Sequence, residues 1–208
     1  MGHTRRTARG IAAGAAVVAA AVLGTVPAPA AEASEEAAAA DMPGFLEPSD
    51  MPPDPFSTWY GAGGPSEGPH WPLCGETLVL PEANVWNAAY STPETAAGSQ
   101  VSVVLPTEAG AVTFAAQAEA AITGCEARME QEQPDRPVTS WDHGWIDVEE
   151  GARVYGTGFQ SGWGYRNQLV SVGRDGDTVT IVSWESNWGD PPVDAFKETT
   201  RTAVNRLY

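Results

Sequence analysis

The sequence predicts an α+β fold: one domain with an antiparallel sheet and two main helices packed on one face of it. Strand-like runs rich in β-branched residues stand before and after one helical segment, and a second helical segment closes the chain. From Pro43 onward there are roughly 165 residues, which is enough for one domain with its own core and too few for two.

The N-terminus has the layout of a secretory signal peptide over residues 1–30. Arg5, Arg6 and Arg9 precede an apolar run over residues 11–26, and an Ala-Pro-Ala cleavage site follows at 28–30. A spanning helix needs about 20 apolar residues, so the run is short for an uncleaved anchor. The bulky apolar residue of a twin-arginine signal is absent, which favours the Sec route. We therefore expect a secreted protein without a stable membrane anchor.

Charge and composition limit the partners of the mature chain. Residues 31–42 are rich in Ala and Glu and predict a disordered tail before a domain over residues 43–208. The chain has 27 acidic and 11 basic residues, a formal net charge of −16. Removal of residues 1–30 would delete three basic residues and no acidic one, which brings the charge to −19. Such a charge repels phosphate backbones, so we expect no nucleic-acid partner.

Two helices are predicted from apolar spacing and end signals. The first begins at Glu108 with Thr107 as N-cap, and Gly124 marks its fraying end. Its apolar face repeats at spacings of three and four: Ala111, Phe114, Ala118, Ile122, Cys125 and Met129. The second begins with Asp190 as N-cap and Pro191 at the first helical position. Its inner face is Val193, Phe196, Thr200, Ala203 and Leu207.

The strongest strand signal is a hairpin around Asp175-Gly176, a preferred type I′ turn between two β-branched runs. That turn sets a register in which Val170 opposes Ile181, Leu169 opposes Val182, and Arg166 opposes Glu185. Further strands are expected at Val85–Tyr90, Gln100–Leu105, Val138–Asp142 and Ala152–Phe159. The Pro- and Gly-rich stretch Pro43–Pro72 is expected to be mostly irregular.

Cys74 and Cys125 are the two cysteines of the chain and allow one intramolecular pairing. In an exported protein a structural disulfide is the favoured interpretation. The alternative is a catalytic thiol, which needs a nearby base, and His70 lies four residues from Cys74.

The sequence offers no motif for a metal, a cofactor or an enzymatic reaction. The chain contains no CxxC or HxxxH spacing, so we expect neither a metal site nor a cofactor. A glycosidase needs only two carboxylates at a suitable separation, and several acidic residues are candidates for such a pair. They are Asp142, Asp147, Glu149, Glu150 and Glu185. Neither spacing nor context singles out two of them.

Aromatic residues supply the remaining signal, since eight tryptophans are many for this length. Trp163 and Tyr165 precede the hairpin, and Trp184 and Trp188 follow it, so the four rings flank its open end. Such rings suit a cleft for a sugar, lipid or peptide. The alternative is that they cover the second face of the sheet. Two charged residues beside these rings are either a polar anchor for a ligand or an inert surface ion pair: Arg166 and Glu185.

The order of features resembles the actinobacterial PknH-like extracellular sensor domain family. The resembling features run from the segment Phe45–Pro52 through Cys74, the helix from Glu108 to Cys125, and the Val-rich hairpin to the closing helix at Leu207-Tyr208. The resemblance implies an α+β domain with a curved antiparallel sheet, helices on one side, a family disulfide matching Cys74 and Cys125, and a cleft for an unidentified ligand. A second disulfide, a kinase domain and a lipidation site, which occur in that family, have no counterpart in this sequence.

These observations lead us to expect a stand-alone, secreted, non-enzymatic ligand-binding domain of the sensor kind. The predicted ligand-binding residues are Trp163, Tyr165, Arg166, Trp184, Glu185 and Trp188. The partner would be a small molecule, glycan, lipid or peptide. Two alternatives stay open: a cell-envelope hydrolase with a carboxylate pair, and an acidic module that binds or inhibits a basic protein.

Overall fold

The computed structural model describes residues 40–61, 64–68, 78–162 and 164–208. Contacts join the described residues into one compact unit. The predicted signal peptide, most of the predicted tail, Cys74 and Trp163 lie outside the described residues. Within the described part, no helix is long and apolar enough to cross a membrane.

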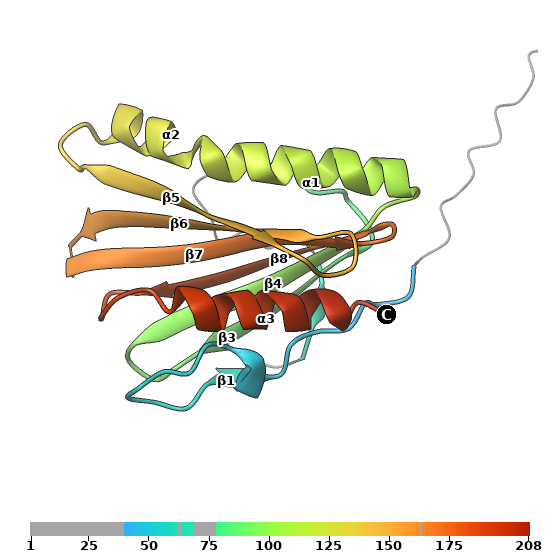
Figure 1. Ribbon diagram of the computed structural model, residues 1–208, viewed down its shortest axis with the longest axis horizontal. Coiled ribbons are helices and arrows are strands. Elements are labelled where there is room, and N and C mark those ends of the chain that lie inside the picture. The colour runs from blue at the N-terminus through green and yellow to red at the C-terminus, as the bar shows by residue number, and fades with distance from the viewer. Residues whose placement is uncertain (1–39, 62–63, 69–77, 163) are drawn as a thin grey trace, which may run out of the picture. The chain divides into compact units, whose positions relative to one another are not determined.

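The α+β class is confirmed, with an open curved antiparallel sheet in a single domain (Figure 1). Its strand order is β1-β3-β4-β8-β7-β6-β5, and β2 also pairs with β3. The strands are β1 (Tyr60–Gly61), β2 (Ser66–Glu67), β3 (Val85–Ser91), β4 (Ala96–Val104), β5 (Val138–Ile146), β6 (Ala152–Ser161), β7 (Gly164–Asp175) and β8 (Thr178–Ser186). The helices are α1 (Glu108–Thr123), α2 (Cys125–Glu132) and α3 (Val193–Asn205).

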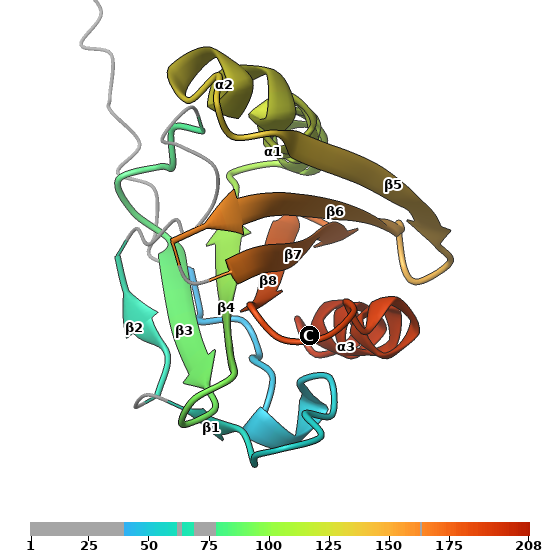
Figure 2. The same ribbon diagram turned by 90° about the vertical axis from the view of Figure 1, so that its left-hand side faces the viewer.

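The expectation that both main helices pack on one face of the sheet is wrong. Phe114 and Ile122 of α1 pack with Val170 and Ile181, whereas Phe196 of α3 packs in a separate cluster on the other face. Figure 2 shows α3 on the concave side of the sheet, with α1 and α2 on the opposite side. The central strands therefore lie between two helical layers.

The central hairpin is buried on both faces because its apolar residues do not alternate with polar ones. In β8, Val179 and Ile181 face α1, while Val182 and Trp184 belong to the α3 cluster. A strand that is apolar on both faces needs cover on both. This pattern, with both sets of side chains at most 5% exposed, explains why the helices divide between the faces.

The first predicted helix is confirmed, including its ends. The hydroxyl of Thr107 accepts a hydrogen bond from the backbone N–H of Gly110, which satisfies one of the free donors at the helix start. Gly124 ends α1, and α2 begins at Cys125. The buried residues of α1 are Ala111, Phe114, Ala118 and Ile122, which is the predicted face.

The closing helix begins later than predicted. Its first residue is Val193, and Pro192 rather than Asp190 occupies the N-cap position, without a side-chain cap. A residue that precedes proline is pushed out of the helical region of backbone space, so Pro191 cannot take the helical conformation before Pro192. The inner face of α3 is as expected, with Phe196, Thr200 and Ala203 buried.

The β7–β8 hairpin exists, but its predicted register is wrong by two residues. Asp175 pairs with Thr178, so Gly176 and Asp177 are the turn residues, and Gly176 has a φ of +55°. Gln168 consequently lies opposite Glu185, in place of Arg166. A shift of two residues keeps each side chain on its predicted face, because side chains alternate with a period of two.

The segment before β1 packs against α3 and the sheet. Leu46 donates its N–H to Gln100 Oε1 at 2.8 Å and accepts a hydrogen bond from Tyr90 Oη at 2.7 Å. Arg206, at the end of α3, forms an ion pair with Asp50 at 2.7 Å. Irregular backbone was expected over Pro43–Pro72, and the described part of that stretch contains a 3-10 turn at Pro48–Asp50 and the short strands β1 and β2.

Candidate functional site

The described site residues predicted from the sequence surround the connection between β8 and α3, but they line three separate cavities. Tyr165 lines the first, which we call the aromatic cavity. Arg166 and Glu185 line the second, the charged cavity. Trp184 and Trp188 line the third, the proline cavity. Neighbouring residues of β7 point to opposite faces of the sheet, which is why Tyr165 and Arg166 separate.

The aromatic cavity has a volume of about 460 Å³, within the usual range for small-molecule sites. Its walls come from β5, from the start of β7 and from the β8–α3 connection. The lining residues are Trp141, His143, Gly156, Thr157, Tyr165, Asn167, Gln168, Leu169, Asn187, Gly189, Asp190 and Pro191. The rings of Trp141 and Tyr165 are 42% and 44% exposed, so each presents a surface that a ligand can cover.

Two glycines in β6, of which Gly156 lines this cavity, let His143 and Tyr165 lie against the strand. A Cβ atom at Gly156 would lie 2.6 Å from His143 Nε2, and one at Gly158 would lie 2.8 Å from Cζ of Tyr165. Both distances are shorter than any side chain tolerates, so the two rings occupy the space that side chains of β6 would fill. A glycine inside a strand commonly marks such a close approach. The positions of the two rings therefore depend on the absence of two side chains.

His143 is neutral near pH 7 in this environment. Burial disfavours its charged form and lowers its pKa, Lys197 acts in the same direction, and Asp142 opposes them. Its Nε2 atom is buried, and no atom of the described residues forms a hydrogen bond with it. This atom lies against Gly156, and other atoms of the side chain line the cavity.

Amide and carboxylate groups complete the rim. Asn167 donates from Nδ2 to the carbonyl oxygen of Gly189 at 3.0 Å, which ties β7 to the connection before α3. Asn187 accepts from Arg166 Nε at 3.1 Å through its Oδ1. Asp190 is the one carboxylate among the described lining residues, and no Lys or Arg is among them.

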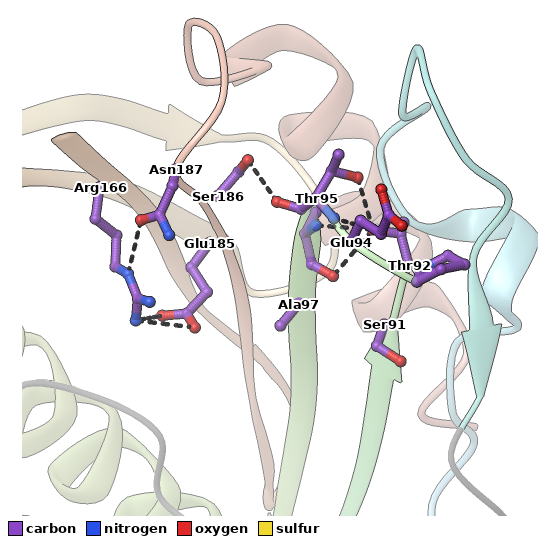
Figure 3. A pocket seen from close by; sticks show the side chains of 11 residues that line it. Ser91, Thr92, Glu94, Thr95, Ala97, Arg166, Glu185, Ser186 and Asn187 are labelled. Atoms are coloured by element: carbon purple, nitrogen blue, oxygen red, sulfur yellow. Dashed lines mark hydrogen bonds and ion pairs between the residues drawn. The ribbon is translucent and has the colours of Figure 1, made fainter. Parts of the chain in front are cut away.

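The charged cavity, of about 280 Å³, lies between the β3–β4 turn and the ends of β7 and β8 (Figure 3). Arg166 Nη1 is 3.3 Å from Glu185 Oε1, and Gln168 Nε2 donates to Glu185 Oε2 at 3.0 Å. Both charged side chains are 32% exposed. Figure 3 shows this pair directed at each other, with Asn187 beside the arginine. Each group already has a partner, which fits the interpretation as a surface ion pair.

The proline cavity has a volume of about 290 Å³ and joins the segment before β1 to the end of β8. Trp184 is only 5% exposed and belongs to the core beneath α3, whereas Trp188 is 62% exposed. The predicted rings therefore differ in character. The core interpretation holds for Trp184, while Trp188 and Tyr165 offer free surface in different cavities.

Sequence reasoning missed Trp141 and His143, which form one wall of the aromatic cavity. A signal for them was present in β6, where Gly156 and Gly158 stand two positions apart inside a strand. Such spacing indicates that a neighbouring group approaches one face of the strand. The β5–β6 pairing then identifies the neighbours, because Trp141 pairs with Gly156.

The carboxylates considered for hydrolysis do not form a pair in the aromatic cavity. Asp142 forms an ion pair with Arg153, and this hydrogen bond lowers its pKa. A general acid needs a raised pKa instead. Glu150 accepts from the N–H of Gly176 at the hairpin turn. Within the described residues, no group of three potential metal ligands comes together.

Cys125 is 2% exposed and lies at the start of α2. Because Cys74 lies outside the described residues, the Cys74–Cys125 disulfide stays a prediction.

Comparisons with known proteins give one distant likeness. No protein-family model and no curated protein matches the chain. Among solved structures, the extracellular domain of PknH from Mycobacterium tuberculosis is similar, with 10% sequence identity and a TM-score of 0.47. The alignment covers 72% of this chain and 86% of that one. A likeness at this level does not assign the chain to the PknH-like family, which remains a resemblance.

Proposed function

We propose that this domain is a secreted, non-enzymatic ligand-binding module whose ligand occupies the aromatic cavity. The observation that carries the proposal is the aromatic cavity itself, whose wall includes His143 and Tyr165 because Gly156 and Gly158 leave room for these two rings. A concave site with aromatic walls and a few convergent polar groups is the usual form of a small-molecule site. The sensor role that the family resemblance implies is part of this proposal.

The test is a thermal melt of the chain from Ala31 to Tyr208 with fractionated envelope glycans, lipids and peptides. A ligand at 100 times its dissociation constant adds about 2.7 kcal/mol to the free energy of unfolding. We expect a saturable shift that Trp141→Ala removes and Trp145→Ala keeps. Trp145 is a matched control because it lies on the same strand, is 61% exposed and lines none of the three cavities. Equal shifts in both variants would place binding elsewhere and contradict the proposal.

Secretion has its own test. We expect N-terminal sequencing of protein from the culture medium to begin at Ala31, after the Ala-Pro-Ala site. Protein that stays in the cell and begins with Met1 would contradict this part of the proposal and leave ligand binding untouched.

A further inference from the structure

We infer that the aromatic cavity takes a neutral sugar, and that Asp190 selects against anionic sugars. This inference rests on the ligand-binding function proposed above and names the class of ligand. It follows from the charge of the lining, the arrangement of its polar atoms and the exposure of its rings.

The charge of the lining excludes anions. Asp190 is the one formally charged side chain among the described lining residues, and the chain as a whole carries a net charge of −16. Phosphates, uronic acids and other anions are held in proteins by Arg or Lys, and neither residue lines this cavity. An anionic ligand would meet repulsion from Asp190 and from the surrounding field.

The polar atoms call for a ligand with several hydroxyl groups. His143 Nε2 lies above Gly156, and Tyr165 Oη lies above Gly158, on the same face of β6. These two positions are about 7 Å apart along the strand. His143 Nε2 is buried against Gly156, so a ligand meets the Tyr165 side chain and the asparagines of the rim. A phenol can both donate and accept, and so can a hydroxyl group.

The asparagines have hydrogen-bonding capacity left over. Asn167 uses its amide N–H on Gly189, and its Oδ1 has no partner among the described residues. Asn187 uses its Oδ1 on Arg166, and its Nδ2 has no partner there either. Both side chains line the aromatic cavity, and Asn187 also lines the charged cavity beside Arg166. Planar amides of this kind satisfy neighbouring hydroxyl groups of a sugar ring.

The rings supply the apolar half of the recognition. Trp141 and Tyr165 are both half-exposed, and a pyranose ring has an apolar C–H face that covers such a surface. A fatty acyl chain would bury the free polar atoms of Asn167 and Asn187 without partners, which costs free energy for each of them. The combination of flat rings and unused polar atoms therefore favours a sugar over a lipid.

Binding of small-molecule probes to the full mature chain is measured by ligand-observed NMR and by titration of tryptophan fluorescence. The probes are neutral methyl glycosides of gluco, galacto, manno and arabino configuration, with glucuronate and galacturonate as anionic matches. Cyclohexanol and tetramethylammonium test whether the rings of Trp141 and Tyr165 bind a compound that is not a sugar. We expect at least one neutral glycoside to bind about tenfold more tightly than its uronate at low salt, and a smaller difference at 1 M salt. Asp190→Asn should reduce the difference in affinity between the neutral glycoside and its uronate.

Variants show whether the cavity itself binds. Trp141→Ala should weaken the glycoside about tenfold or more, Tyr165→Phe should weaken it about threefold to tenfold, and Trp145→Ala should leave it unchanged. Tighter binding of a uronate would overturn the inference. Binding of cyclohexanol or tetramethylammonium in this cavity, without any glycoside, would also overturn it while the proposed function stands. Absence of binding by every probe would overturn the inference, whereas the proposed function would be overturned only if the thermal melts with lipid and peptide fractions also showed no shift.

Discussion

At the scale of single residues, two rings of the aromatic cavity lie against β6 because two residues of that strand have no side chain. Gly156 and Gly158 let His143 and Tyr165 lie against the strand, and any other residue at these positions would displace the rings. His143 gains a half-buried, neutral imidazole from this arrangement, with its Nε2 atom fully buried. The same burial makes its titration a measurable property of the folded state.

The titration of His143 predicts how the stability of the protein changes with pH. The pKa of His143 in the unfolded chain is near 6.5, and burial lowers it in the folded state. As the pH falls below 6.5, the unfolded chain takes up a proton that the folded chain resists, so stability falls until the lower folded pKa is passed. His143→Gln removes this component, and its melting temperature should fall less between pH 7 and pH 5. Parallel pH curves for the two proteins would contradict the prediction.

Single residues also show what the sequence could reveal of the site. Tyr165 was found because it stands beside the hairpin, and it does line the largest of the three cavities described. Trp184 was grouped with it, yet it packs beneath α3. Composition identifies aromatic residues, but the face of a strand on which each ring lies depends on the register. Trp141 and His143 were missed because their nearness to Tyr165 arises only when β5, β6 and β7 align.

At the scale of elements, glycines in the β7–β8 hairpin have two different roles: one allows a positive φ and the other allows close packing. Gly176 has a φ of +55° with no atom within 4 Å of an added Cβ. Gly173 has no positive φ, but an added Cβ would meet Val204 of α3 and lie 3.1 Å from Cβ of Ala152. Gly162, between β6 and β7, has neither constraint. Substitutions at these three positions therefore compare backbone strain, close packing and the absence of both constraints.

We expect Gly176→Ala to cost about 1–2 kcal/mol of unfolding free energy through backbone strain. Gly173→Ala should cost about 1–3 kcal/mol because it forces α3 away from the sheet. Gly162→Ala should change stability by about 0.5 kcal/mol or less. Denaturant melts of the three variants measure these differences. Equal costs at Gly173 and Gly162 would contradict the close packing of α3 on β7.

The ends and register of an element were predictable where local hydrogen bonding sets them, and not where packing against other elements sets them. Thr107 and Gly124 mark the ends of α1 through their own backbone and side-chain bonding, and both ends were found. The register of β7–β8 depended on a choice between two adjacent two-residue turns, Asp175-Gly176 and Gly176-Asp177. Contacts with the neighbouring strands β4 and β6 favour the second, and these contacts lie far away in the sequence.

At the scale of the whole molecule, a covalent link is predicted between Cys74 and the helical layer of α1 and α2. The closed loop between Cys74 and Cys125 has a chain-entropy value of about 4 kcal/mol, from which native strain subtracts. We expect reduction, or Cys125→Ser, to lower the melting temperature by about 5–15 °C. Mass spectrometry of the untreated protein should find the chain two hydrogens lighter than its reduced form. Free thiols in the exported protein would contradict the link.

The last prediction concerns how the N-terminal segment completes the α3 side of the molecule. Leu46, Met51 and Trp59 are at most 7% exposed and belong to the same core cluster as Phe196 and Val204 of α3. Polar contacts fix the segment in place. Thr199 donates to the carbonyl oxygen of Asp50 at 2.6 Å, and Arg206 donates to that of Phe45 at 3.1 Å. The segment thus acts as a structural layer over the concave face.

Two truncations measure that layer. A chain that begins at Pro43 keeps the segment and should melt like the chain from Ala31. A chain that begins at Tyr60 loses three buried side chains, each contributing about 1.5–3 kcal/mol, so it should lose on the order of 5 kcal/mol. Since a domain of this kind has about 5–15 kcal/mol in total, the shorter chain should be marginal or unfolded by circular dichroism. Equal melting temperatures for the two truncated chains would mean that the sheet and α3 hold together without the segment. The segment would then contribute little to the stability of the core beneath α3.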